Sequence, residues 1–219
     1  MSPHIRAAML IGIACVSILG VRTGHADPGR WSLGGTFGAG IYAGGSFNDS
    51  LAAFGYREVK TGWEYGGSIR YRVRPRLSID AEIVSMNGRG TTDSVDPKFV
   101  AETHGIAIAV SLYQQMSQND AYSFSLFGGA GPAFGMKWTA EQGAAQFKSR
   151  TKATWYAHAG FEGQIKAGGR FGFVSRALGR VAMARDVAQD DDPSTRFDVS
   201  MNGAAFSVGI RWYFGSSNY

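Results

Sequence analysis

Apolar and polar side chains alternate with a period of two in several separate segments of this chain. In residues 63–73, Trp63 and Tyr65 fall on one face of an extended backbone, while Glu64 and Arg70 fall on the other. Because successive side chains of a β-strand point to opposite faces, this alternation predicts strands with one apolar and one polar side. The pattern therefore indicates a sheet in which every strand separates two different environments.

Eight segments follow this alternation, and most are about ten residues long, the length that a tilted strand needs to cross a bilayer. They are residues 31–41, 63–73, 77–83, 104–113, 122–134, 155–165, 171–183 and 206–214. Long polar connections at 44–62, 87–103, 137–154 and 186–205 alternate with short turns at 74–76, 115–121 and 168–170. An even strand number with this rhythm is typical of outer-membrane barrels. The sequence therefore predicts an all-β fold, an eight-stranded antiparallel up-and-down transmembrane β-barrel, with both termini in the periplasm.

The charged residues of these segments fall on the polar face. An Arg or Lys in the middle of the hydrocarbon costs roughly 2–4 kcal/mol, so these side chains must line the lumen. A soluble barrel of the lipocalin kind is excluded, because it packs apolar side chains inside and would leave this aromatic face in water. The predicted lumen residues are Glu64, Arg70, Arg72, Asp80, Glu82, His158, Glu162, Arg176, Arg180 and Arg211.

The predicted lumen charges have both signs and come from opposite walls, while the segments 31–41, 104–113 and 122–134 turn mostly small residues inward. Eight strands enclose an interior just wide enough for side chains to fill, and buried charges need partners. We therefore expect a plugged lumen. The alternative is a narrow hydrated pore, in which the surplus of inward Arg predicts a weak preference for anions. In the plugged lumen, Asp80 and Glu82 pair with Arg70, Arg72, Arg176 or Arg180, and Glu162 and His158 join them.

Residues 1–26 have the pattern of a cleaved signal peptide. A polar start containing Arg6 precedes the apolar stretch 7–21, and small residues precede the expected cleavage point. The apolar stretch is shorter than the roughly 20 residues that would span a bilayer as a helix. The predicted division is thus a signal peptide at 1–26 and an outer-membrane β-barrel domain at 27–219. Cleavage removes two Arg and the only Cys, so the formal net charge falls from +5 to +3.

The composition agrees with a membrane barrel and limits the partners. Gly makes up 31 of 219 residues, aromatic residues 13% and charged residues 18%, unlike a helical bundle or a disordered chain. The net charge is small, and we expect no nucleic-acid partner. Aromatic residues gather at strand ends, as in the girdles that anchor barrels at headgroup level. They are Trp31, Tyr42, Trp63, Tyr71, Tyr122, Phe134, Trp138, Trp155, Phe171, Trp212 and Phe214.

The last segment carries a specific motif, in which a polar residue, Ser207, precedes Gly209 and the aromatic residues Trp212 and Phe214. This spacing resembles the C-terminal signal that the barrel-assembly machinery recognises. Over residues 30–214 the chain resembles small outer-membrane β-barrels of the OmpA/OmpX/OmpW superfamily, although five residues follow the motif. The resemblance implies a monomer in the bacterial outer membrane, with lipids, lipopolysaccharide, the assembly machinery and periplasmic chaperones as partners.

Enzymes also occur on similar barrels, among them lipid A deacylases and palmitoyltransferases. The deacylases carry a His and a Ser on the outer rim, but here His158 points inward and His104 has no Ser at the expected spacing. We find no seryl nucleophile set against a His and an acid, as nucleophilic catalysis would require. A lipid A-modifying enzyme is therefore the weakest alternative, and we expect no catalytic residue and no cofactor.

The polar connections hold the remaining candidates. Residues 137–152 are basic and would meet lipopolysaccharide phosphates if they are extracellular. The run Asp190–Asp192 offers carboxylate oxygens to Ca²⁺ but matches no defined Ca²⁺ loop, and we predict no metal site. The leading function is a structural or surface-interaction barrel. The first alternative is a narrow channel for small molecules, as in the OmpW branch.

Overall fold

The computed structural model describes residues 30–43, 45–119, 121–167 and 170–214. The predicted signal peptide at 1–26 and the tail after Phe214 lie outside the described residues, so their predictions stay open. Among the described residues, no helix is long and apolar enough to cross a membrane.

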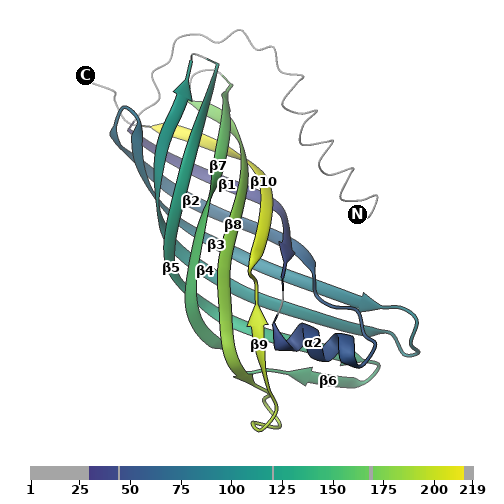
Figure 1. Ribbon diagram of the computed structural model, residues 1–219. Helices are drawn as coiled ribbons and strands as arrows, with labels where there is room; N and C mark the ends of the chain where they lie inside the picture. The colour runs from purple at the N-terminus through teal and green to yellow at the C-terminus, as the bar shows by residue number, and fades with distance from the viewer. Residues whose placement is uncertain (1–29, 44, 120, 168–169, 215–219) are drawn as a thin grey trace.

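Eight antiparallel strands form a closed ring, in the order β10-β1-β2-β3-β4-β5-β7-β8, and β8 pairs back with β10 (Figure 1). The predicted eight-stranded up-and-down barrel is thereby confirmed. Every segment predicted as a strand lies within one of these elements. The ring strands are β1 (Trp31–Tyr42), β2 (Thr61–Arg74), β3 (Leu77–Thr92), β4 (Phe99–Gln118), β5 (Tyr122–Gln142), β7 (Lys152–Lys166), β8 (Phe171–Ala188) and β10 (Gly203–Phe214).

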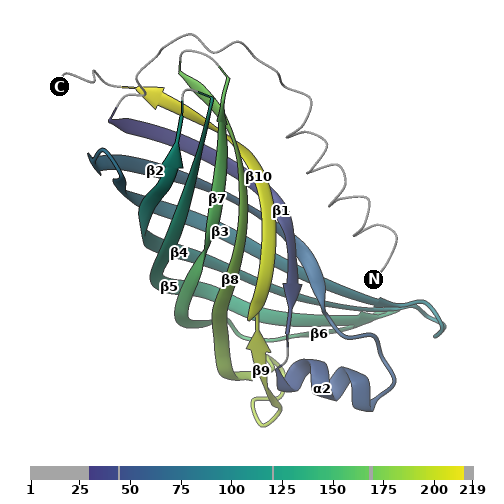
Figure 2. The same ribbon diagram turned by 45° about the horizontal axis from the view of Figure 1, so that its top comes forward.

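The two ends of the barrel differ. At one end the chain enters β1 and leaves β10, where Trp31 pairs with Phe214, and the ring strands are joined by short turns. At the other end lie the helix α2 (Ser46–Ala53) and two short strands, β6 (Ala145–Lys148) and β9 (Arg196–Ser200), as Figure 2 shows. We call these the turn end and the helix end.

The predicted long connection at 87–103 is wrong, because β3 runs to Thr92 and β4 starts at Phe99. In the same way β5 reaches Gln142, and β4 continues to Gln118 where a turn was expected. In these extensions polar residues such as Asn87 and His104 take the outward positions, while Met86 and Ala101 face the interior, so the apolar-outward alternation does not continue. The backbone ladder does not depend on that alternation, and paired strands therefore continue beyond the apolar belt.

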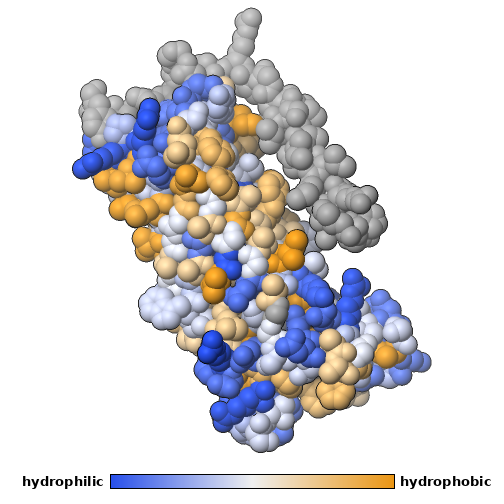
Figure 3. Space-filling view, in the orientation of Figure 1, coloured by the Kyte–Doolittle hydropathy of each residue, from blue (hydrophilic) through white to orange (hydrophobic). Residues whose placement is uncertain are grey.

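The apolar face of the ring points outward. Phe37, Trp63, Val110 and Ile210 are each more than half exposed. On the face shown in Figure 3, apolar residues form a band across the middle of the barrel, and polar residues cover its ends. Trp31 packs against Tyr71 at the turn end, with ring centroids 4.7 Å apart. An outward apolar band of this kind is the surface that a membrane barrel presents to lipid.

Two of the aromatic residues predicted for the girdles are not on the surface. Tyr42 and Trp138 are each 2% exposed and lie in the interior at the helix end. In β5 a β-bulge between Ala133 and Met136 shifts the register against β7, and Trp138 points inward beyond it. A bulge reverses which parity faces the lumen, and a sequence pattern does not reveal it.

Candidate functional site

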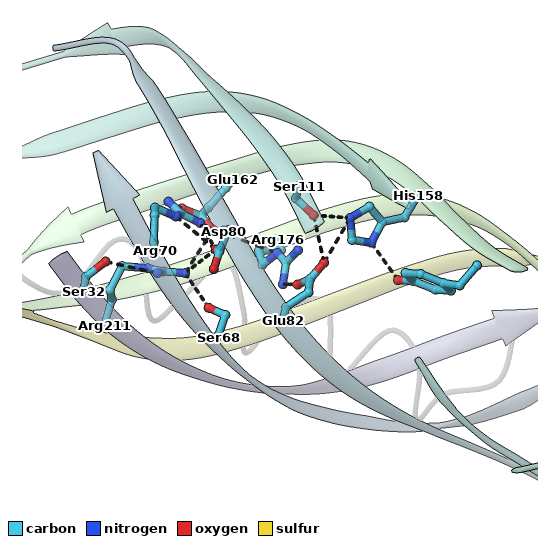
Figure 4. A network of polar contacts seen from close by, with 11 residues as sticks. Ser32, Ser68, Arg70, Asp80, Glu82, Ser111, His158, Glu162, Arg176 and Arg211 are labelled. Carbon is cyan, nitrogen blue, oxygen red and sulfur yellow. Dashed lines mark hydrogen bonds and ion pairs between the residues drawn. The ribbon is translucent and has the colours of Figure 1, made fainter. Parts of the chain in front are cut away.

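Nine of the ten predicted lumen residues are buried inside the barrel, each no more than 8% exposed. Figure 4 shows most of them converging between the walls of the barrel. We call this group the charged layer. It consists of Glu64, Arg70, Asp80, Glu82, His158, Glu162, Arg176, Arg180 and Arg211.

Two ion pairs of the charged layer cross the whole lumen. Arg70 of β2 donates to both carboxylate oxygens of Glu162 of β7, at 2.7 and 2.9 Å. Arg176 of β8 donates to Glu82 of β3 at 3.0 Å. In the ring order β2 and β7 are four strands apart, and so are β3 and β8, so each pair joins diametrically opposite walls.

Asp80 adds Arg211 to the first of these pairs, and the two pairs meet where Arg176 lies 3.9 Å from Glu162. The Oδ2 of Asp80 accepts hydrogen bonds from Arg70 at 2.9 and 3.0 Å and from Arg211 at 3.3 Å. The guanidinium of Arg211 also donates to the hydroxyls of Ser32 and Ser68. Since bonds to ionised groups are stronger than neutral ones, the shared carboxylate ties three strands together.

Inward glycines leave the space that these long side chains occupy. A Cβ added at Gly34 would lie 3.1 Å from the Arg211 guanidinium, and one at Gly40 would collide with Glu64 and Arg180. At Gly129 it would lie 2.8 Å from the His158 ring nitrogen. The high Gly content of the inward positions is therefore a requirement of the charged layer.

The remaining acid of the layer is Glu64, for which the sequence predicted a lumen position but no partner. Glu64 pairs with Arg180, whose Nε also donates to the carbonyl oxygen of Met201 at 2.8 Å. Arg72 was predicted to join the network, but it lies half-buried nearer the turn end, and no ion pair joins it to another described residue. Arg72 is on the same face of β2 as Arg70, but it lies two residues further along the strand, closer to the turn end than the carboxylates.

Ser111, His158 and Glu82 come together in the layer, which the sequence did not predict. The hydroxyl of Ser111 lies 2.8 Å from His158 Nε2, and Glu82 Oε1 lies 3.0 Å from the same nitrogen. The other ring nitrogen contacts the hydroxyl of Tyr156 at 2.7 Å. A catalytic triad needs the acid and the nucleophile on different nitrogens of the imidazole. This cluster is therefore a buried hydrogen-bond network and not a triad.

Between the charged layer and the helix end, the lumen is apolar. We call this cluster of buried residues the apolar layer. The sequence analysis predicted a mixed-charge network in the lumen but did not identify this layer. Its members are Tyr42, Phe47, Leu51, Val59, Met86, Phe99, Ala101, Ala107, Ala109, Ala133, Met136, Trp138, Ala140, Tyr156, Ala182, Ala184, Val187, Val199 and Met201.

The helix α2 closes the apolar layer. Phe47 stacks on Trp138 with ring centroids 5.0 Å apart, and Leu51 is also buried. Asn48 holds the helix to the following segment, because its amide donates to the Val59 carbonyl and its oxygen accepts from the Val59 N–H, at 3.1 and 3.0 Å. The sequence analysis missed this helix within 44–62. The spacing of four between Phe47 and Leu51 is the signal that could have found it.

The acidic run at Asp190–Asp192 is part of a local turn. The carboxylate of Asp192 accepts hydrogen bonds from the hydroxyls of Ser194 and Thr195, at 2.5 and 2.7 Å. These bonds, led by that of Ser194, lower the pKa of Asp192. No group of three His, Cys, Asp or Glu residues suited to a metal ion occurs among the described residues.

The residues of the predicted assembly signal lie at the seam where β10 pairs with β1. Ser207 faces the lumen, and Trp212 faces outward and stacks with Phe171. A Cβ at Gly209 would collide with the carbonyl oxygen of Gly35, so only glycine fits there without a shift of the backbone. Phe214 is half-buried and pairs with the first residue of β1. Recognition by an assembly machinery stays a prediction.

No protein-family model and no curated protein matches this chain. Solved structures of similar fold include the outer membrane protein OprG from Pseudomonas aeruginosa, with a TM-score of 0.53 at 11% identity over 87% of this chain and 99% of OprG. Ail, the attachment invasion locus protein of Yersinia pestis, gives 0.47 at 15% identity over 85% and 99% of the two chains. Neisserial surface protein A gives 0.46 at 9% identity over 86% and 99%.

These similarities extend over nearly the whole of each solved structure, and the superposition on OprG supports the ring of eight strands described above. The resemblance stated from the C-terminal motif is confirmed at the level of the fold. The chain therefore has the fold of the small outer-membrane β-barrel proteins.

Proposed function

We propose that this chain is an integral outer-membrane β-barrel with a structural or surface-interaction role and a closed lumen. The observation that carries the proposal is the filling of the lumen at two successive levels. The charged layer joins opposite walls through Arg70–Glu162 and Arg176–Glu82, and α2 seals the apolar layer beyond it.

The charge balance of the layer supports a plug. Glu64, Asp80, Glu82 and Glu162 face Arg70, Arg176, Arg180 and Arg211, so four carboxylates meet four guanidiniums. A buried charge without a partner is strongly unfavourable, which keeps each side chain in place. The count is balanced within the layer, and the Arg that exceeds it, Arg72, lies nearer the turn end.

The burial of the two residues that could take part in nucleophilic catalysis favours a binding or structural role. Ser111 and His158 lie within the closed lumen, Ser111 fully buried and His158 only 5% exposed.

In the orientation we propose, both termini are periplasmic and the helix end faces the outside. Basic residues of that end, such as Lys148 and Arg150, then meet lipopolysaccharide. The barrel is a monomer, inserted by the assembly machinery through β10 with the help of periplasmic chaperones.

Planar-bilayer recording on the purified, refolded protein tests the proposal. The fold is first verified by heat-modifiable gel mobility, since a folded barrel migrates differently before and after boiling. We expect no steady current through the folded protein. A steady ohmic conductance would contradict the plug and favour a narrow channel for small molecules. A shift in lipid A mass on overexpression would contradict the non-enzymatic role.

A further inference from the structure

A small polar cavity opens at the turn end, on the side of the charged layer opposite to α2. Its volume is about 50 Å³, and Arg70 and Tyr113 lie among its lining residues. An ordered water needs roughly 10–15 Å³ in this measure, so the cavity holds a few waters or one small ion. We call it the vestibule.

The charge of the vestibule has one sign. Arg30, Arg70, Arg72 and Lys166 line it, and no carboxylate does so among the described residues. Arg70 is neutralised by Asp80 and Glu162, which lie deeper in the lumen. Arg72 makes no ion pair with another described residue, so its charge is not balanced by a carboxylate among the described lining residues. The remaining lining groups are neutral hydroxyls and amides, Ser125 and Gln164 among them.

Tyr113 provides a second and independent observation. It is 2% exposed, yet its hydroxyl has no hydrogen-bond partner among the described residues. Its ring is fixed by Phe127, stacked at 4.8 Å, and by the Arg70 guanidinium 3.5 Å from its centroid. A buried hydroxyl without a partner is unfavourable, so its retention beside a positive cavity indicates a ligand that accepts its hydrogen bond.

We propose that the vestibule binds a small oxyanion of the phosphate class. Arg72 supplies a planar guanidinium for two phosphate oxygens, and Tyr113 and the serine hydroxyls supply neutral donors. The tetrahedral anion suits a cavity of this size that is lined by donors from several strands. This binding site is separate from the lumen plug, because the charged layer lies between the vestibule and α2.

Titration with inorganic phosphate in chloride buffer, followed by NMR of the refolded barrel in micelles, tests the proposal. We expect saturable shifts of the amides near Ser125. Arg72→Gln should weaken binding about tenfold or more, because it removes a charge-assisted contact. Tyr113→Phe should weaken binding several-fold without loss of heat-modifiable mobility, since the hydroxyl has no hydrogen-bond partner to lose in the part of the chain that the structure describes.

Arg76→Gln is the matched control. Arg76 is exposed in the turn after β2 and does not line the vestibule, but its loss removes the same charge from the same end. We expect less than a twofold change in affinity. An equal effect of Arg72→Gln and Arg76→Gln would overturn the proposal. The proposal would also fail if the wild-type protein gave no saturable shift with inorganic phosphate and none with short-chain phosphatidylglycerol.

A second arm of the titration distinguishes the source of the phosphate group. Short-chain phosphatidylglycerol is added in place of inorganic phosphate, and Arg72→Gln is compared again. Binding of both compounds, or of either alone, with the same dependence on Arg72 supports the site and identifies the form of phosphate that it takes. Binding of the lipid that is independent of Arg72 would assign that binding to the outer belt and count against the vestibule.

Discussion

The two levels of the lumen reach closure by different physical means. The charged layer is held by ion pairs between opposite walls, and every carboxylate is matched by a guanidinium. The apolar layer contains small Ala side chains and three fully buried Met residues, and it depends on an inserted helix. The charged layer is therefore made by side chains of the barrel wall, whereas the apolar layer is closed by a helix from the connection between β1 and β2.

This difference separates contacts between the strands of the barrel wall from contacts made by a segment that connects two strands. Arg70 and Glu162 belong to ring strands, so breaking their contact disturbs the whole ring. Phe47 belongs to a connection between two strands, so its release disturbs the end of the barrel alone. The changes below test that contrast.

The largest effect is expected from Glu162→Gln in the charged layer. It leaves Arg70 without its main partner inside the barrel, and breaking a buried pair in this way costs about 3–5 kcal/mol. Urea unfolding in lipid vesicles, read by gel mobility, measures the change. Glu102→Gln is the control, because its ion pair with Arg89 is half exposed, and it should change stability by no more than about 1 kcal/mol.

In the apolar layer, Phe47→Ala should act locally. Truncating a buried Phe costs about 3–5 kcal/mol, but here the loss falls on the seating of α2. We expect hydrogen exchange of the α2 amides to rise roughly a hundredfold, while the urea midpoint of the barrel stays within error. Phe54→Ala, at a side chain 78% exposed, should leave exchange unchanged. A fall of the urea midpoint as large as that of Glu162→Gln would erase the contrast between the layers.

Asn48→Ala should weaken the same helix to a smaller degree. It leaves the buried N–H and carbonyl of Val59 without partners, which costs about 1–3 kcal/mol. Limited proteolysis between β1 and β2 measures the opening. Asp49→Ala, at the exposed neighbouring position, should change the cleavage rate much less, and equal rates would assign no special role to the Asn48 side chain.

The smallest effect concerns a turn outside both layers. Hydrogen bonds from Ser194 and Thr195 lower the pKa of Asp192, so they stabilise the turn above the ordinary Asp pKa. That stabilisation is lost as the pH falls through the lowered value. The Ser194 amide shift should therefore titrate below the ordinary Asp range. Titration at or above that range would show that the bonds do not form in solution.

The alternation of residues 63–73 was sufficient to predict β2 and the lumen position of Arg70. The partners were harder to predict, because Glu64 and Arg72 share one parity and yet only Glu64 reaches the level of an opposite charge. Depth along the axis depends on register, which neither parity nor composition specifies. The helix α2 escaped prediction because eight residues with two buried apolar side chains give little periodic signal.

Polar strand extensions escaped prediction for a related reason. Asn87 and His104 face each other across β3 and β4 and are joined by a hydrogen bond of 2.6 Å, but they read as a polar connection. Sequence patterns reveal a strand where its two faces meet different environments. Beyond the apolar belt the outward face becomes polar and the inward face lines the apolar layer, so the alternation that marks the membrane-facing strands is lost.

Single-channel recording on four proteins tests most directly that two closures lie in series. The proteins are the wild type, Phe47→Ala to unseat α2, Arg70→Ala with Arg176→Ala to remove both guanidiniums that cross the lumen, and the variant that combines all three changes. The two closures predict that the first three proteins carry no steady current and that the fourth conducts. A steady current through Phe47→Ala alone would contradict closure by the charged layer, and a silent fourth protein that is folded would contradict the claim that these two levels close the lumen.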